Sequence, residues 1–125
     1  MMSRPAATFS AAARGTRVRV RVLPSIADVD VAAGAGGLVL PARSGRCRAF
    51  FHPRQAVPVA GSIAGTIVLP ADGPLLELVP HEATHAVMHD LRAATHVNDE
   101  ELATTVGLLS AAIFQGLERR GLAPW

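Results

Sequence analysis

Residues 75–91, LLELVPHEATHAVMHDL, decide the fold, because they predict one long helix in the second half of the chain. The preceding Asp72-Gly73-Pro74 is a helix-start signal, with the aspartate as N-cap and the proline tolerated in the first turn. Pro80 lacks a backbone donor, so it must either kink this helix or mark a later beginning. Residues 81–85 then spell HEATH, and helical positions four apart lie on one face.

A second helix is predicted from Asn98 or Asp99 to Arg120, where Gly121 would stop it. The asparagine or aspartate cap precedes two glutamates, and negative charge is favourable at that end of a helix. The most apolar window, residues 102–117, is shorter than a membrane span requires and contains polar side chains. We therefore expect a buried helix and no membrane partner.

Strand signals dominate the first half of the chain, and the clearest is RVRVRV at residues 17–22. Its strict alternation predicts a half-buried strand with the valines inward and Arg17, Arg19 and Arg21 outward. Such a charged row keeps an exposed strand soluble, and the alternative is that it grips an acidic partner.

Shorter segments complete the predicted sheet. Residues 38–41 and 46–51 predict two strands around the turn-like triplet 43–45. Residues 62–69, SIAGTIVL, predict the last strand, which could add a substrate peptide as a further strand if it lies at the sheet edge. The Gly-rich stretch within residues 26–37 is expected to be a flexible turn, because no GK[ST] follows it.

The length of 125 residues suits one domain with one modest core. Residues 1–16 contain no continuous apolar run, so we expect a flexible N-terminal tail before a single domain at 17–125. The expected fold class is α+β, with a three- to four-stranded antiparallel or mixed sheet followed by two packed helices.

Charge and cysteine content limit the possible partners and the cellular compartment. All twelve basic residues are arginines, but the formal net charge is only +2 and no long basic block is present, so nucleic acid is a weak expectation. Cys47 is the single cysteine, which excludes a disulfide within the chain and the cysteine-rich zinc frameworks. A reducing cytoplasm fits this cysteine usage best.

The HEATH pentapeptide has the spacing of a metal centre. His81 and His85 can reach one ion from the same face, and Glu82 stands beside them as a general base. A tetrahedral zinc site for hydrolysis needs a third protein ligand and one open position for water. The candidates are His89, His96, Glu100 and Glu101.

Two arguments order these candidates. His89 would lie about 12 Å along the helix axis from His81, too far to share its ion. Glu100 falls on a stripe of small residues, Ala103, Gly107 and Ala111, that would let the two helices approach closely, whereas Glu101 shares a face with Thr105 that looks solvated. Glu100 is therefore the preferred third ligand, with Glu101 still open.

The order HEATHAVMH followed by DEELA in a second helix resembles the small gluzincin-like metallopeptidases of phage and prophage type, with the ImmA/IrrE pattern. The resemblance covers residues 62–120 and implies a zincin-like fold. It also implies a zinc-dependent peptidase in the bacterial cytoplasm, acting on a protein or peptide substrate. His81, His85 and Glu100 would be the zinc ligands and Glu82 the catalytic base.

Two alternatives belong to other classes. One is a zinc-binding phage accessory or assembly protein with a zincin fold and little activity. The other is a basic module without metal that binds a partner or nucleic acid through the row Arg17, Arg19 and Arg21. Zinc binding separates these two, and the effect of Glu82→Gln separates the peptidase from the accessory protein.

Overall fold

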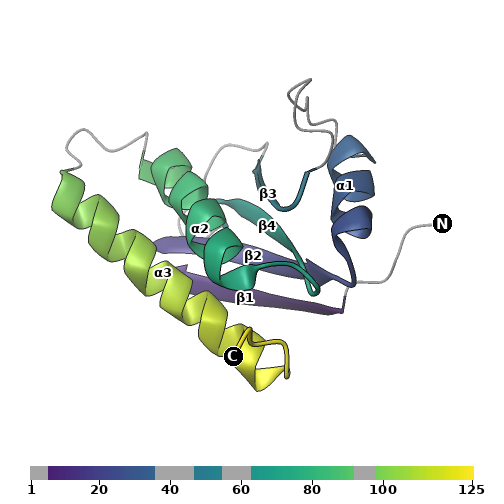
Figure 1. Cartoon of the computed structure of the whole chain (residues 1–125). Coiled ribbons are helices and arrows are strands. Elements are labelled where there is room, and N and C mark those ends of the chain that lie inside the picture. The colour runs from purple at the N-terminus through teal and green to yellow at the C-terminus, as the bar shows by residue number, and fades with distance from the viewer. Residues whose placement is uncertain (1–5, 36–46, 55–62, 92–97) are drawn as a thin grey trace.

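The computed structural model describes residues 6–35, 47–54, 63–91 and 98–125 (Figure 1). Four strands form one sheet in the order β1-β2-β4-β3, in which β2 and β4 are parallel and the outer pairs are antiparallel. The α+β class and a mixed four-stranded sheet are thus confirmed. The elements in chain order are β1 (Ala7–Ala13), β2 (Thr16–Leu23), α1 (Ile26–Ala35), β3 (Phe50–Pro53), β4 (Gly65–Pro70), α2 (Leu75–Leu91) and α3 (Asp99–Arg119).

The first two strands form a tight hairpin. Arg14 and Gly15 both have positive φ, 49° and 90°, and Ala13 pairs with Thr16, as expected for a two-residue hairpin turn of the mirror-image type. The expectation of a flexible tail over residues 1–16 is therefore wrong from Ala7 onward. The strand was hidden because its inward positions are mostly alanines, which give a weak alternation.

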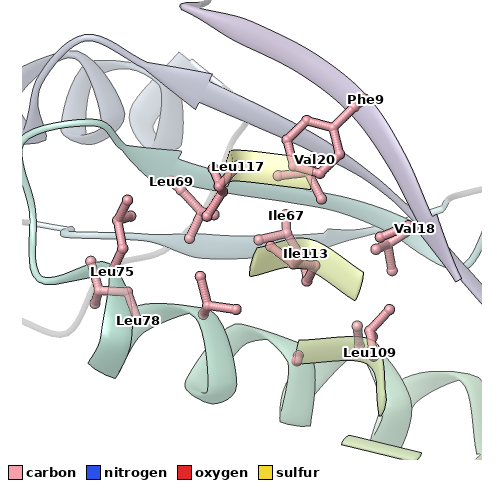
Figure 2. Close-up of a cluster of buried hydrophobic side chains, with 14 of the residues drawn as sticks. Phe9, Val18, Val20, Ile67, Leu69, Leu75, Leu78, Leu109, Ile113 and Leu117 are labelled. Carbon is pink, nitrogen blue, oxygen red and sulfur yellow. The ribbon is translucent and has the colours of Figure 1, made fainter. Parts of the chain in front are cut away.

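The two faces of the sheet carry different layers. The face beneath α2 and α3 holds the main core, in which the β2 valines and Ile67 and Leu69 of β4 meet Leu109 and Ile113 of α3 (Figure 2). On the opposite face, α1 packs through Val29 and Ala33, and this smaller cluster also contains Leu23, Phe50 and Val68. The predicted burial of the β2 valines is confirmed, since all three are fully buried.

Helix α1 corrects the expectation of a flexible turn at residues 26–37. The Ser25 hydroxyl accepts a hydrogen bond from the Asp28 amide at 3.2 Å and donates to the Asp28 carboxylate at 2.9 Å. This reciprocal arrangement is a variant of the capping box and starts the helix despite its glycine. The Asp72 carboxylate, expected to cap α2, accepts a hydrogen bond from the Ile26 amide at 2.9 Å instead.

The later strands differ from expectation in place and length. Residues 38–41 lie outside the described residues, and β3 begins at Phe50 rather than near residue 46. Strand β4 lies between β2 and β3, so the condition under which residues 62–69 could pair with a substrate peptide, a place at the sheet edge, is not met. Its run of buried Ile67, Val68 and Leu69 is typical of a strand covered on both faces. The edge strand nearest α2 is β3.

Both long helices are confirmed. Helix α2 spans Leu75–Leu91 with Pro80 inside it, and the Pro80 carbonyl accepts a 2.7 Å hydrogen bond from the Thr84 hydroxyl. Helix α3 is capped by Asn98, whose side chain accepts a bond from the Glu101 amide at 2.8 Å. Within the described ranges, no helix is both long and apolar enough to cross a membrane.

Helix α3 is fixed against β1 by a close contact. A Cβ on Gly116 would overlap the ring of Phe9, so the glycine lets helix and strand meet. Arg120 lies over the same ring, 4.4 Å from its centroid, and donates to the Gly116 carbonyl at 2.9 Å. This contact places α3 on the β1 side of the sheet, while α2 lies over β4 and β3 (Figure 1).

Candidate metal centre

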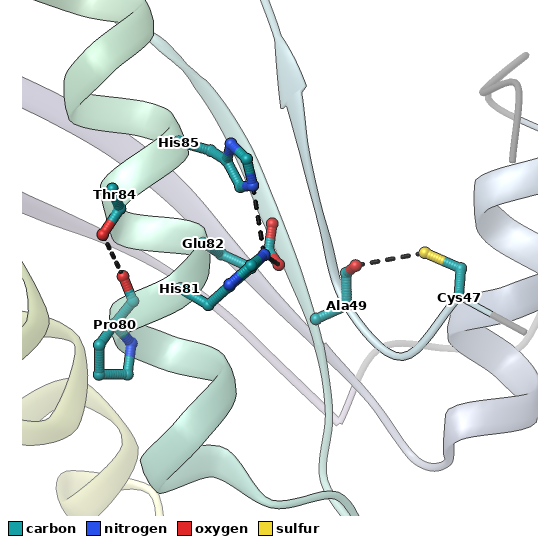
Figure 3. Close-up of polar contacts among 7 residues, drawn as sticks. All are labelled: Cys47, Ala49, Pro80, His81, Glu82, Thr84 and His85. Atoms are coloured by element: carbon teal, nitrogen blue, oxygen red, sulfur yellow. Dashed lines mark hydrogen bonds and ion pairs between the residues drawn. The ribbon is translucent and has the colours of Figure 1, made fainter. Parts of the chain in front are cut away.

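The two HEATH histidines lie on the flank of α2 that faces β3. Their Nε2 atoms are 3.2 Å apart and their ring planes are inclined by 75° (Figure 3). Two nitrogens bound to one tetrahedral zinc at 2.0–2.1 Å are separated by about 3.3 Å. The ring nitrogens of His81 and His85 therefore already have the spacing of two corners of a zinc tetrahedron. Both residues are exposed, so solvent or a substrate can reach them.

Glu82 stands beside this pair but is buried. Only 4% of its surface is accessible, and its Oε2 is 3.9 Å from His81 Nε2. Burial raises the pKa of the Glu82 carboxyl, and the nearby His81 lowers it by a smaller amount. A carboxylate with a raised pKa is a better proton acceptor near neutrality, which suits a general base.

A pocket of about 220 Å³ opens next to these side chains. It is lined by Arg48, Ala49, Glu77, Leu78, His81 and Glu82. Arg48 and Ala49 lead into β3, and Arg48 reaches across to Glu77 on α2 with a 3.5 Å ion pair. The sequence argument missed both residues, because nothing in the local pattern of residues 46–51 signals that they border a helix about thirty positions later.

Cys47 lies behind the Ala49 wall of this pocket. Its thiol donates to the Ala49 carbonyl at 3.2 Å (Figure 3). Its amide donates to the Asp30 carboxylate at 2.8 Å. Burial is the largest cause that raises the pKa of the Cys47 thiol, and the charges of Glu82 and Asp30 raise it further.

The reasoning that selected Glu100 is not supported by the packing of α3. The stripe that Glu100 shares with Ala103, Gly107 and Ala111 is exposed, and Glu100 itself is exposed. Thr105, which was grouped with Glu101 as solvated, is buried. The side of α3 that packs on the sheet contains Thr105, Leu109, Ile113 and Gly116. On this side Gly116 lies against the ring of Phe9.

Among the described residues, no three His, Cys, Asp or Glu side chains are grouped closely enough to hold a metal ion. The structure thus unites His81, Glu82 and His85 but does not bring Glu100 or Glu101 to them. His89 packs against the ring of Phe51, with centroids 5.7 Å apart, as a structural contact. His96 lies outside the described residues. His52 is part of β3.

No protein-family model matches the chain, and the searches of curated proteins and of solved structures also give no match. A function is therefore inferred from the residues and geometry of the site.

Proposed function

We propose that the protein is a zinc-dependent hydrolase of the metallopeptidase class, with a zincin-like arrangement of the HEATH helix against the sheet. The observation that carries the proposal is the 3.2 Å separation of the His81 and His85 Nε2 atoms, with the buried Glu82 carboxylate on the same flank. Two surface histidines one helical turn apart can reach the same spacing through a hydrogen bond between their ring nitrogens, so the buried acid beside the pair is what favours a metal site.

In the proposed site, His81 and His85 hold zinc through their Nε2 atoms. Glu100 stays the third-ligand hypothesis, with Glu101 as its alternative, but neither is grouped with the two histidines in this structure, so zinc binding would require the first turn of α3 to approach α2. Zinc, when bound, supplies a lowered pKa for a coordinated water and polarises the scissile carbonyl. Glu82 would take the proton from the attacking water and pass it to the leaving amine.

The substrate would be an extended peptide or protein segment. Strand β3 is the sheet edge beside the pocket, and Arg48 and Ala49, which line the pocket, lead directly into it. A peptide laid along this edge could pair with β3 and place a carbonyl near the histidines. This moves the predicted substrate edge from residues 62–69 to β3.

The first test is zinc content by elemental analysis after reconstitution. We expect one zinc per chain in the wild type and loss of zinc in His85→Ala. His52→Ala is the matched control, because it removes an imidazole away from the HEATH flank and should retain zinc. Loss of zinc in Glu100→Ala but not in Glu101→Ala would support the preferred third ligand. No zinc in the wild type would refute the proposal.

Activity requires a second measurement. A pool of unstructured peptides is incubated with zinc-loaded protein and cleavage is followed by mass spectrometry. We expect cleavage that is lost in Glu82→Gln even though this variant still binds zinc, because the base alone is removed. Zinc binding without cleavage in the wild type would favour the accessory-protein alternative.

A further inference from the structure

The arginine row of β2 lies in the middle of the sheet. Strand β2 pairs with β1 on one side and with β4 on the other, so it has no free edge. Arg17 and Arg19 are exposed and Arg21 is half-buried, all on the face opposite α2 and α3. Charged residues commonly protect edge strands from aggregation, and that explanation does not apply to a central strand.

The surroundings of the row contain no counter-charge on the strands. Across the β1–β2 and β2–β4 registers, the neighbours of these arginines are uncharged: Thr8, Ser10 and Ala12 on β1, and Thr66 and Val68 on β4. Among the described residues, no ion pair within 4.0 Å involves any of the three arginines. Like charges two residues apart on one face repel each other, so the row favours an anionic partner.

The acidic residues lie off the strands, and two of them, Asp28 and Asp30, lie on α1, which shares the arginine face. All ten lie on the helices or in the turn before α2: Asp28, Asp30, Asp72, Glu77, Glu82, Asp90, Asp99, Glu100, Glu101 and Glu118. Helix α1 shares the arginine face, but it packs on Leu23, Phe50 and Val68 at one end of the sheet. Arg17 and Arg19 are exposed at the other end, which gives a cationic surface with the hydroxyl groups of Ser10 and Thr66 beside it.

We propose that this face binds the phosphate backbone of single-stranded nucleic acid. Side chains on one face of a strand recur every two residues, about 6.6–6.8 Å, which permits three successive charges to contact one extended polyanion. Guanidinium groups pair with phosphate oxygens, and the hydroxyls of Ser10 and Thr66 can donate to the same backbone.

The central position of β2 distinguishes nucleic acid from an acidic peptide. A peptide gains much of its affinity for a sheet by pairing with a free strand edge, and β2 offers none. A nucleic-acid strand carries its charges on its own backbone and needs no such pairing. Among the described residues, no Phe or Trp side chain is exposed on the arginine end of this face, so we expect little base stacking and weak dependence on sequence.

The test is fluorescence anisotropy of a labelled 20-nucleotide oligothymidylate with the full chain at 50 mM and 200 mM salt. The double variant Arg17→Gln/Arg19→Gln is compared with Arg48→Gln/Arg119→Gln, which changes the net charge equally away from the row. We expect the row variant to lose tenfold or more in affinity, with a salt slope reduced by about 1.4, from about 0.7 per phosphate contact for single strands. Thermal melting checks that both variants fold.

Equal weakening in the two double variants would overturn the proposal, because it would show a response to net charge alone. Tighter binding of polyglutamate than of the oligonucleotide at the same salt would replace it with an acidic protein partner. No binding by the wild type at 50 mM salt would also refute it. The variant His81→Ala/His85→Ala should bind the oligonucleotide as the wild type does, which keeps this result separate from the zinc proposal.

Discussion

The two faces of the sheet differ in what each can tolerate. The face beneath α2 and α3 is closed by fully buried aliphatic side chains, whereas the other face is covered by α1 at one end and exposes Arg17 and Arg19 at the other. One alternating strand, β2, supplies both faces. The comparison teaches that the covered face determines stability, while the open face is free to serve binding, and substitutions on adjacent residues of one strand can separate the two.

The largest effect is expected for Ile67→Ala. Ile67 is fully buried in β4 under both helices, so its truncation should cost about 2–5 kcal/mol of unfolding free energy through lost burial and a cavity. The neighbouring Thr66 lies on the open face, so Thr66→Ala should lower the unfolding free energy by less than about 1 kcal/mol. Denaturant unfolding measures both. Similar losses in the two variants would contradict the division between the faces.

A smaller effect is expected at the contact between β1 and α3. Gly116→Ala forces a Cβ into the Phe9 ring, whereas Gly107→Ala on the same helix meets open space. Both replacements carry the same gain in helix propensity, so the difference between them isolates the clash. We expect Gly116→Ala to be less stable than Gly107→Ala by about 1–3 kcal/mol in thermal or denaturant unfolding. Equal stability would show that Phe9 is not held in place.

Glu82→Gln tests how the buried Glu82 carboxyl affects the stability of the metal-free protein. Because burial raises the pKa of Glu82 above its ordinary value of 4.5, the folded state binds a proton more readily than the unfolded state. Its contribution to stability is complete below the unfolded pKa and is lost as pH rises through the folded pKa. The glutamine variant should therefore melt above the wild type at pH 7, and the difference should disappear in acid. A melting-temperature difference that is constant with pH would refute the raised pKa of Glu82 in the folded state.

The smallest effect is expected for Arg19→Gln. The side chain is exposed and has no ion-pair partner within 4.0 Å among the described residues. Its removal should change the unfolding free energy by less than about 0.5 kcal/mol. Relief of repulsion in the arginine row predicts that any change is stabilising and is larger at low salt. Denaturant unfolding at two salt concentrations measures it, and a large loss would indicate a structural role.

The predictions from sequence succeeded where local chemistry alone sets the structure. The bounds of α2, the Asn98 cap of α3 and the inward valines of β2 follow from periodicity and capping. Strand β1 was missed because its alanines give little alternation, although Arg14-Gly15 is a hairpin signal. Helix α1 was missed because the following glycines outweighed the Ser25-x-x-Asp28 signal.

In the candidate site, too, the residues that local spacing predicts differ from those that long-range packing brings in. The neighbourhood of His81, Glu82 and His85 follows from spacing along one helix, and the structure places them together. The place of Arg48 depends on long-range packing, which no local pattern encodes. The inward face of α3 could have been predicted, because Leu109, Ile113 and Leu117 recur every four residues on one side of the helix. The face of α3 was misjudged because small residues suggested close helix packing, whereas the actual close approach is made by Gly116 on Phe9.

The parallel pairing of β2 with β4 has a consequence for how the chain folds. The β1–β2 hairpin joins residues close in sequence through a two-residue turn, but Val18 must find Gly65 across the segment that contains α1 and β3. Closing that long loop costs entropy before its contacts are gained, so the hairpin can form on the microsecond scale and the central pairing comes later. The arginine row would then form first, on the β1–β2 hairpin. Helix α2 with its histidines could pack only later, once β4 has completed the sheet.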